Sequence, residues 1–420
     1  MNDMEEIGMP TLHIKVDPTK SVEEQKEVLQ NRWHPDIPAI ADVKPGEDFI
    51  IESLDWTAGQ VKNNDSAVDI RDMDLTPNHH LTGPIYIDGA EPGDLLVVDI
   101  LDIGVHEKQK WGFNGIFCKE NGGGFLTDHF PHAHKSIWDI KGVYATSRHV
   151  PGIRIPALTH PGILGTAPDH KLLEKWNERE RKLIEKNPER VPPYALPPEP
   201  NNAIFGNMSP SSGEYQRIAK EAARTIPPRE NGGNRDIKNL TLGARAYIPV
   251  FVEGAKLTIG DLHFSQGDGE ITFCGAIEIA GFTHLGVDLI KDGMNKYNIE
   301  HTMIVPSPIE PRFTNYLVFE GYSVDEDGNQ HYLDASVAYR RACLEAINYL
   351  SQFGYTPEQA YSILGTAPIE AKISSIVDLP NACCTLWIPT DIFDFDIMPT
   401  KEGPVKVVKG GDLPTAKVGE

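Results

Sequence analysis

The sequence lacks the features that mark secreted, membrane-bound and disulfide-rich proteins. Its 420 residues include only 5 cysteines, and none of them forms a CxxC pair. This odd, scattered set favours free thiols in a reducing compartment. No stretch approaches the roughly 20 apolar residues that a membrane span needs, and the acidic N-terminal residues do not resemble a secretory or transit peptide. We therefore expect a cytoplasmic protein with no membrane association.

Positive charge is also scarce. The chain has 39 Lys and Arg residues against 61 Asp and Glu residues, which gives a formal net charge of -22. So large an excess of negative charge repels nucleic acid and anionic membranes, and neither is an expected partner. A neutral or cationic small molecule is the most compatible substrate. The proportions of hydrophobic (40%) and charged (24%) residues are those of an ordinary globular protein.

Glycine and proline, by contrast, are abundant, with 37 and 33 residues. They divide the chain into short apolar runs, a pattern typical of many short strands joined by loops. We expect strands at 85–87, 95–103, 246–252, 256–265, 270–280, 316–320, 373–377 and 383–388. Strands and helices do not alternate regularly, which excludes a doubly wound parallel sheet. The predicted fold is mainly β, with β-sandwich-like sheets and supporting α-helices.

Helices are expected in four places. Residues 170–186 and 335–353 place their apolar residues on one helical face. A helix at 214–223 follows a capping-box signal formed by Ser211 and Glu214. A shorter helix is expected to begin after Thr356.

The predicted domain organisation is simple. We expect one catalytic domain over residues 1–420. The Pro-rich stretch at 187–202 cannot form regular structure, and we interpret it as an excursion that drapes a neighbour or covers a pocket. A linker between two domains is the alternative. Residues 399–420 are predicted to form a mobile C-terminal arm.

The segment 260–270 carries the most informative pattern in the chain. Its Asp268-Gly269 pair is a strong signal for a two-residue hairpin, because a type I′ turn requires positive φ at both positions. That turn predicts a register in which His263 lies opposite Cys274. Since side chains alternate along a strand, one face of the hairpin then gathers Asp261, His263, Glu270, Thr272, Cys274 and Glu278. The other face is apolar and is expected to join the core through Leu262, Phe264, Ile271, Phe273, Ile277 and Ile279.

The polar face of this hairpin has the composition of a metal or catalytic site. It carries carboxylates and an imidazole but no Lys or Arg, unlike a solvated sheet surface. Asp261 and His263 are two residues apart on one strand, so their Cα atoms lie about 6–7 Å apart and both side chains can reach one ion. Such a set suits Zn²⁺ or a related divalent ion. A hydrogen-bonded polar network without a metal is the alternative.

Three further segments contain useful residues without a decisive pattern. Glu91 lies in a Gly/Pro turn, which by itself is an ordinary turn. The adjacent His79 and His80 could ligate a metal or shape a pocket, although such pairs are more typical of a polar loop. Residues 232–236 begin with paired glycines that allow a close backbone approach, and Asp236 could point inward. No Gly-x-Ser-x-Gly nucleophile elbow is present.

Together these motifs resemble those of the acetamidase/formamidase family. The similarity lies in residues 83–94, 162–168 (Gly-Ile-Leu-Gly-Thr-Ala-Pro), 232–236, 244–257, 260–270 and 276–281. Residues 377–389, which begin Val-Asp-Leu-Pro-Asn-Ala-Cys-Cys, and 392–396 resemble the formamidase branch in particular. The resemblance spans nearly the whole chain, and its motifs are long and occur in order.

This resemblance implies hydrolysis of a short aliphatic amide, here formamide to formate and ammonia, in nitrogen metabolism. It also implies a homo-oligomer (a trimer or a dimer of trimers) and a divalent metal cofactor, for which we expect zinc. The family positions for metal ligands and for acidic catalytic residues fall on Asp236, Asp261 and His263, and on Glu91, Glu270 and Glu278. We add His80, Cys274 and His284 as candidate substrate-binding residues.

Our mechanistic hypothesis is metal-assisted attack by water. The ion lowers the pKa of a bound water and polarises the amide carbonyl. Glu270 is the expected general base and then proton donor to ammonia, while Glu91 or Glu278 orients the water or binds the amide nitrogen. One alternative is a metal-free amidase that uses Glu270 as base or Cys274 as nucleophile. The other is a non-enzymatic, β-rich metal-binding protein.

Overall fold

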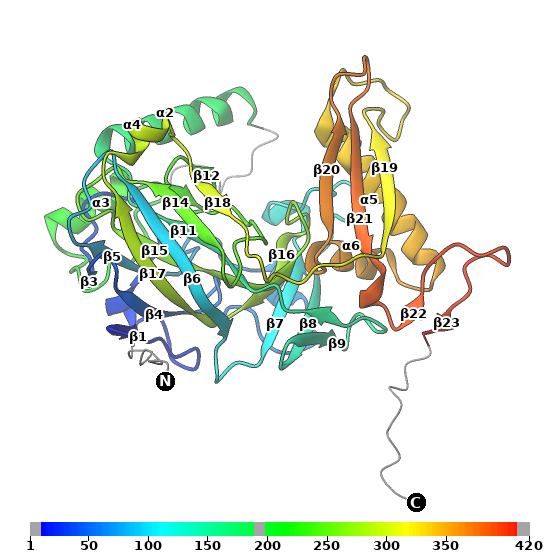
Figure 1. Cartoon of the computed structure of the whole chain (residues 1–420), viewed down its shortest axis with the longest axis horizontal. Coiled ribbons are helices and arrows are strands. Elements are labelled where there is room, and N and C mark those ends of the chain that lie inside the picture. Colours follow the sequence, from blue (N-terminus) through cyan, green and yellow to red (C-terminus); the bar gives the residue numbers. More distant parts are fainter. Residues whose placement is uncertain (1–9, 189–197, 410–420) are drawn as a thin grey trace, which may run out of the picture.

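Two large β-sheets contain most of the strands in the computed structural model, which describes residues 10–188 and 198–409 (Figure 1). The first sheet has 6 strands in the order β1-β4-β17-β6-β14-β18. Their bounds are Leu12–Ile14 for β1, Asp48–Ser53 for β4, Gly281–Ile290 for β17, Leu95–Val105 for β6, Arg245–Pro249 for β14 and Met303–Val305 for β18. The pairs that β6 and β17 form with each other, with β14 and with β4 are antiparallel, and all of them join strands far apart in the sequence.

The second sheet has 10 strands and contains the segment that the sequence singled out. Its order is β10-β9-β8-β7-β16-β15-β5-β2, with β11 beside β15 and β3 beside β5. The bounds are Ile155–Pro156 for β10, Tyr144–Ser147 for β9, His134–Lys141 for β8, Trp111–Ile116 for β7, Phe273–Ile279 for β16, Leu257–Gln266 for β15, Leu81–Ile87 for β5, Leu29–Gln30 for β2, His160–Gly165 for β11 and Ala41–Val43 for β3. All residues of β15 are buried, so both of its faces are covered.

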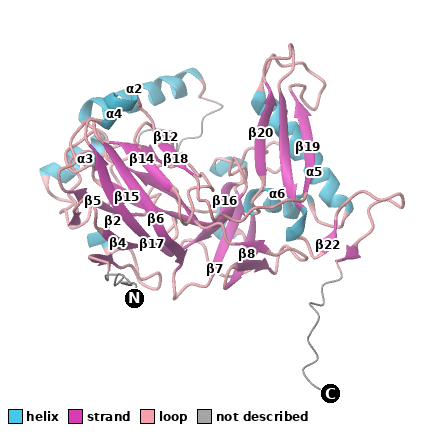
Figure 2. Cartoon of the chain, in the orientation of Figure 1, coloured by secondary structure: helices cyan, strands magenta, loops and turns pink. Residues whose placement is uncertain are grey.

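A third sheet stands beside the two large ones near the C-terminus (Figure 2). It has 3 strands in the order β19-β21-β20, with bounds Tyr316–Tyr322, Cys383–Pro389 and Glu370–Ser375. Helix α5 (Ala335–Gln352) packs against this sheet, and α6 (Pro357–Thr366) continues to the large sheet near β7 and β16. The chain between α6 and β20 therefore reaches the loop that joins β15 to β16.

Smaller elements complete the described part of the chain. The remaining α-helices are α1 (Val68–Arg71), α2 (His170–Lys186), α3 (Gly213–Glu221) and α4 (Gly293–Tyr297). Short 3₁₀ turns occur at Lys26–Val28, Lys119–Asn121 and Thr390–Ile392. Two small ribbons pair β12 (Pro228–Arg229) with β13 (Gly232–Gly233) and β22 (Phe395–Asp396) with β23 (Val407–Val408).

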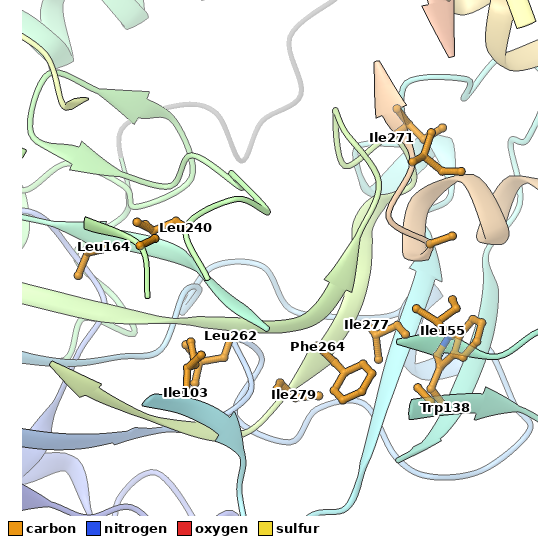
Figure 3. Packing of buried hydrophobic residues seen from close by; sticks show 14 of the residues in the cluster. Ile103, Trp138, Ile155, Leu164, Leu240, Leu262, Phe264, Ile271, Ile277 and Ile279 are labelled. Atoms are coloured by element: carbon orange, nitrogen blue, oxygen red, sulfur yellow. The ribbon is translucent and has the colours of Figure 1, made fainter. Parts of the chain in front are cut away.

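The largest hydrophobic cluster fills the space between the sheets and extends to the third one. It includes residues from both large sheets and from α5, α6 and β21. Figure 3 shows Leu262 and Phe264 of β15 beside Ile277 and Ile279 of β16 in this core. These side chains belong to the face that the sequence pattern predicted to be apolar, and for them and Ile271 the prediction is confirmed. It is wrong for Phe273, which packs against a second cluster and lines the cavity described below. The continuity of the cluster is our reason for proposing a single domain.

Most predicted helices and strands are present close to their expected positions. Helix α2 has the predicted bounds, and α6 begins with a capping box between Thr356 and Gln359. The predicted cap of α3 is wrong by one residue, because the hydroxyl of Ser212, rather than that of Ser211, accepts the N–H of Tyr215. Among the described residues, no helix combines the length and apolar character needed to cross a bilayer.

Two predicted segments lie largely outside the described residues. The Pro-rich excursion at 187–202 includes residues 189–197, and the arm at 399–420 includes residues 410–420. Between 400 and 409 the described chain forms a turn followed by β23, which pairs with β22.

Candidate active site

Acidic side chains from separate parts of the chain meet one histidine on β15. Asp261 and His263 lie on this strand, and Glu278 lies opposite on β16. Asp236 comes from the loop after β13, and Glu270 from the loop between β15 and β16. Ligand-type atoms of Asp236, Asp261 and His263 lie within 4.8 Å of one another, as do those of His263, Glu270 and Glu278. Four carboxyl groups therefore surround a single imidazole.

Both ring nitrogens of His263 have polar neighbours. Its Nε2 lies 3.0 Å from Glu278 Oε2 and 3.2 Å from Asp261 Oδ1. Its Nδ1 lies 2.8 Å from the side-chain oxygen of Gln266. The ring is completely buried, so these neighbours, rather than bulk water, determine its orientation and charge.

The predicted register of the β15–β16 hairpin is wrong, although its consequence for Glu278 is right. The structure pairs His263 with Glu278, and Gln266 with Ala276 across a bulge, instead of pairing His263 with Cys274. The observed partner of His263, Glu278, follows the predicted partner, Cys274, by an even number of residues. Because side chains alternate with period two, Glu278 stays on the same face as His263.

The cause of the shift lies in contacts made by the loop at 267–272. The N–H of Gly267 donates to Gly365 O at 2.6 Å, and the N–H of Asp268 donates to Ile369 O at 3.1 Å. Tyr339 also donates its hydroxyl to Asp268 O at 2.8 Å. These bonds to the C-terminal segment replace the two-residue turn that Asp268-Gly269 favours locally. The longer loop carries Glu270 away from the strand while keeping it beside the cluster.

Gly162 provides the space in which the side chains converge. It lies on β11, which pairs with β15 on the side opposite β16. A Cβ atom at this position would lie 2.6 Å from Asp261 Oδ2, 2.7 Å from Asp236 Oδ1 and 2.8 Å from His263 Cε1. Side-chain carbons do not approach other heavy atoms this closely, so only glycine fits between the three groups.

Burial of so many acids perturbs their protonation. Burial raises the pKa of Glu270 well above its usual value, and Asp236 and Glu278 raise it further. Burial and the neighbouring Asp261 raise the pKa of Asp236 to about 7. Burial opposes the charged form of His263, but Glu278 and Asp261 outweigh it and raise its pKa well above 6.5. The cluster therefore holds extra protons or attracts another cation.

A divalent cation fits the groups that are present. Asp236 Oδ1 and Glu278 Oε2 are buried without a hydrogen-bond partner, although the latter lies 3.0 Å from His263 Nε2. Unsatisfied buried carboxylate oxygens are rare in proteins. Carboxylates and an imidazole are also the ligand types that zinc and related ions bind. Asp236, Asp261 and His263 are the best-placed set, because the cradle beside Gly162 brings their atoms together.

A cavity of about 300 Å³ opens directly onto this cluster. Its walls include the carboxyl groups of Asp236, Asp261 and Glu270, while His263 and Glu278 lie buried behind them. The rest of the lining is a mixture of apolar and polar residues, most notably Trp56, Leu75, His79, Phe125, Asn234 and Phe273. Such a mixed lining suits a small molecule with one polar group to be oriented and little else to be recognised.

The structure places two of the sequence candidates outside the cluster. Glu91 lies at the turn before β6, where its side chain is 69% exposed and pairs with Lys291 at 2.7 Å. His284 lies on β17 in the other large sheet and pairs with Asp48. Glu91 thus lies at the surface, and His284 lies on a strand between β4 and β6. Within this chain, the structure does not bring either residue to the cluster.

Two other candidates are close to the cavity without lining it. His80 is buried with its Nδ1 3.3 Å from Trp56 O, and its neighbour His79 forms the cavity wall instead. Cys274 is buried in an apolar cluster with Trp56 and Phe117. Burial and the nearby Glu278 and Glu270 raise the pKa of its thiol well above the usual value. A thiol in this state is a poor nucleophile.

His79, which the sequence offered together with His80 as a metal ligand or a residue that shapes a pocket, lines the cavity with its Nδ1 2.9 Å from Thr225 Oγ1. Two residues at the site were not identified from the sequence. Gly162 lies within a motif that was noted only for its resemblance, and its role depends on packing between β11 and β15. Gln266 follows His263 by three residues, and only the bulge between them brings both to one place. No local pattern identifies such residues.

Comparisons with known proteins agree along nearly the whole chain. The sequence profile described as the Acetamidase/Formamidase family matches residues 15–395. A formamidase of Methylophilus methylotrophus is 59% identical over 398 residues, which cover 95% of this chain and 97% of that protein. An acetamidase of Mycolicibacterium smegmatis is 57% identical over 372 residues, covering 86% and 91%. The solved structure of a gamma lactamase from Delftia acidovorans is 57% identical, has a TM-score of 0.92 and matches 96% of this chain and 98% of its own.

Proposed function

Because the chain belongs to the acetamidase/formamidase family, we propose that it is an amidohydrolase that converts formamide, and more slowly other short aliphatic amides, to a carboxylate and ammonia. The observation that carries this proposal is the cluster of Asp236, Asp261 and Glu270 at the wall of a small cavity, backed by His263. Such a cluster has the parts needed to hold a cation and to move a proton beside a neutral substrate.

Asp236, Asp261 and His263 would hold a divalent ion, for which we propose zinc. When bound, such an ion supplies Lewis-acid polarisation of the amide carbonyl and lowers the pKa of water. Asp261 and His263 are held on one strand, β15, and the loop that carries Asp236 is held against β11 by backbone hydrogen bonds to Gly162 O. Glu278 lies 3.0 Å from His263 Nε2 and is buried, and we assign it to balancing the charge of the ion rather than to touching substrate.

Glu270 is the proposed general base. It lines the cavity, and its carboxyl group lies within 4.8 Å of the nitrogen of His263. Burial and neighbouring acids raise its pKa, while a cation beside it would bring the pKa back towards the neutral range, where a general base is most effective. Glu270 would accept the proton of the attacking water and pass it to the nitrogen of the departing ammonia.

The cavity favours a small and uncharged amide. Its acidic wall repels anions, whereas apolar side chains such as Phe125 and Phe273 can contact a hydrocarbon substituent. His79 and Asn234 offer polar atoms at the same wall, and we assign them to orienting the amide group. We further propose a cytoplasmic homo-oligomer, a trimer or a dimer of trimers, acting in nitrogen metabolism.

A small cyclic amide is a second candidate substrate. Formamide fills roughly 60 Å³ if it is counted as about two waters of 30 Å³ each, whereas the cavity measures about 300 Å³. The apolar part of the lining could therefore accommodate a ring. The similarity to the gamma lactamase of Delftia acidovorans at 57% identity favours the same extension.

The test is ammonia release from formamide and acetamide, together with ring opening of a γ-lactam, by the purified full-length chain before and after treatment with a chelator. Elemental analysis of the same samples gives the metal content. We expect loss of activity with the metal and recovery when zinc is restored. Full activity in a verified metal-free protein would contradict the metal hypothesis and leave Glu270 or Cys274 as metal-free alternatives.

Two variants separate the roles of the acidic residues. Glu270→Gln removes the base and should lower kcat by about 10²- to 10⁴-fold. Glu91→Gln is the matched control, because that exposed carboxylate pairs only with Lys291 among the groups described around it, and it should leave kcat unchanged. Near-normal turnover by Glu270→Gln would rule out its role as base. A chain that releases ammonia from none of the amides would point to a metal-binding protein without enzymatic activity.

A further inference from the structure

Gln266 lies at the end of β15 and connects the metal-ligand candidates to one another. Its side-chain Nε2 lies 2.7 Å from the backbone oxygen of Asp236. Its Oε1 lies 2.8 Å from His263 Nδ1 and 3.0 Å from His160 Nε2. The whole Gln266 residue is buried. None of the roles assigned above uses this amide.

The orientation of the Gln266 amide is determined by its neighbours. The backbone oxygen of Asp236 can only accept a hydrogen bond, so the group facing it at 2.7 Å must be the donating NH₂ of Gln266. The amide oxygen therefore faces His263. That oxygen has no hydrogen to give, and the nitrogen opposite it must donate.

His160 strengthens the same conclusion. Its Nδ1 lies 2.7 Å from Leu158 O, a group that only accepts, so the proton of a neutral His160 ring is on Nδ1. Its Nε2 is then an acceptor and does not donate to Gln266 Oε1, although the two atoms lie 3.0 Å apart. It also lies 3.3 Å from His263 Nδ1, so the single N–H there is shared between the two acceptors. The two rings meet edge to face at 87°. Two acceptors, one from Gln266 and one from His160, thus converge on the same nitrogen of His263.

We propose that Gln266, assisted by His160, fixes the proton of His263 on Nδ1 and so leaves the lone pair of Nε2 directed at the cluster. The Nε2 atom faces Asp261 at 3.2 Å and Glu278 at 3.0 Å. A carboxylate oxygen and an imidazole lone pair are both acceptors, so this arrangement needs either an added proton or a metal cation that interacts with both, and a bound cation satisfies it with His263 neutral. Histidine ligands in metal sites are commonly oriented in this way, by donating the second ring N–H to a neighbouring acceptor.

In this role Gln266 is a positioning residue that acts through His263 and does not contact the substrate. The inference rests on the metal-assisted function proposed above, but it concerns cation binding and is tested without any amide. The bulge between His263 and Gln266 is what allows it. Without the bulge, the two side chains would project from opposite faces of β15, because they are three residues apart.

The experiment uses Co²⁺ as the probe in the full-length protein, with wild type compared with Gln266→Met and Gln266→Glu. Methionine has a similar length but offers no comparable acceptor, whereas glutamate keeps an acceptor for His263 Nδ1. We expect wild type to bind Co²⁺ and to show a cobalt-shifted imidazole N–H proton that disappears in D₂O. Gln266→Met should bind Co²⁺ 10- to 100-fold more weakly and lose that proton signal, while Gln266→Glu should keep the signal and most of the affinity.

Several results would overturn the proposal. One is a loaded wild-type protein whose cobalt-shifted exchangeable proton lies beside both ring C–H protons of His263, because that proton would then be on Nε2 and the ring would be bound through Nδ1. A second is an equal affinity of wild type and Gln266→Met for Co²⁺. A third is an equal loss of Co²⁺ affinity in Gln266→Met and Gln266→Glu, because the role of Gln266 would then be to hold the backbone of Asp236. Failure of wild type to take up Co²⁺ also contradicts the proposal, and ammonia release by that same protein would leave amide hydrolysis standing. The wild-type spectrum is decisive even if a variant does not fold.

Discussion

Substitution of Gly162, which has no side chain, is the most direct test of the site geometry. Replacing it with alanine adds one methyl group at the point where three functional side chains converge. That methyl carbon would lie 2.6 Å from Asp261 Oδ2, 2.7 Å from Asp236 Oδ1 and 2.8 Å from His263 Cε1. An ordinary contact begins near 3.4 Å, so each of the three groups would have to move by about 0.6–0.8 Å.

The size of the effect follows from how close-packed this region is. Extra methyl groups in a well-packed interior destabilise a protein by about 1–3 kcal/mol. Gly162 lies on β11, between β15 and the loop that carries Asp236. Backbone hydrogen bonds hold both β15 and this loop against β11. The side chains are therefore the parts free to move. If the ligands take up the strain, metal affinity should fall about 10- to 100-fold, since 1.4 kcal/mol corresponds to a factor of ten.

The assay measures metal affinity by competition with a chelator, kcat for formamide, and the free energy of unfolding. Gly213→Ala is the matched control, because nothing lies within 4 Å of the added Cβ at this position in the first turn of α3. It should be neutral or slightly stabilising, by up to about 1 kcal/mol. Wild-type metal affinity and turnover in Gly162→Ala would refute the convergence of ligands at this glycine. A loss confined to unfolding stability would do the same.

Two further predictions follow from buried groups near the cavity. Cys274→Ala should retain turnover and lose about 1 kcal/mol of unfolding free energy, because the substitution leaves a small cavity. A variant that folds but is inactive would instead support Cys274 as the nucleophile. So would a thiol reagent that inactivates the wild-type protein but not the variant. Burial lowers the pKa of His80 to about 4, from 6.5, so between these pH values the unfolded chain binds more protons than the folded one. Stability should therefore fall as pH drops below 6.5, by about 1.4 kcal/mol per unit for this group. Denaturant unfolding at pH 7 and pH 5 measures this loss of stability. If the free energy of unfolding of His80→Gln changed with pH as much as that of wild type, the lowered pKa of His80 would be contradicted.

The sequence was sufficient to predict features that depend on local periodicity. The apolar face of β15 and β16 could be identified because Leu262, Phe264, Ile277 and Ile279 follow a period of two. Helix α2 was predicted with its observed bounds from its one apolar stripe, and the structure adds a cap in which the Asp169 side chain accepts the N–H of Leu172. Asp261 and His263 were placed together for the same reason, as alternate residues of one strand.

The features that were missed depend on contacts between distant parts of the chain. Asp268-Gly269 favours a tight turn, but Gly365 and Ile369, about a hundred residues later, bind its backbone and hold the loop open. Glu91 lies in a motif that resembles the family pattern, yet its turn is at the far end of β5 from the cluster and pairs with Lys291. Only the sheet order brings Gly162 against Asp261.

The same contacts connect the stability of the fold to its chemistry. Four carboxyl groups face one imidazole in a space where water is largely excluded, and their charges cannot all be present without a large desolvation cost. Extra protons can reduce that cost, as the raised pKa values of Glu270 and Asp236 indicate, but they also remove the base that catalysis needs. A bound cation would offset the negative charge and leave Glu270 free to accept a proton. Under the proposed mechanism, the ion that activates the substrate would also make this buried arrangement stable, so its removal should lower activity and unfolding stability together.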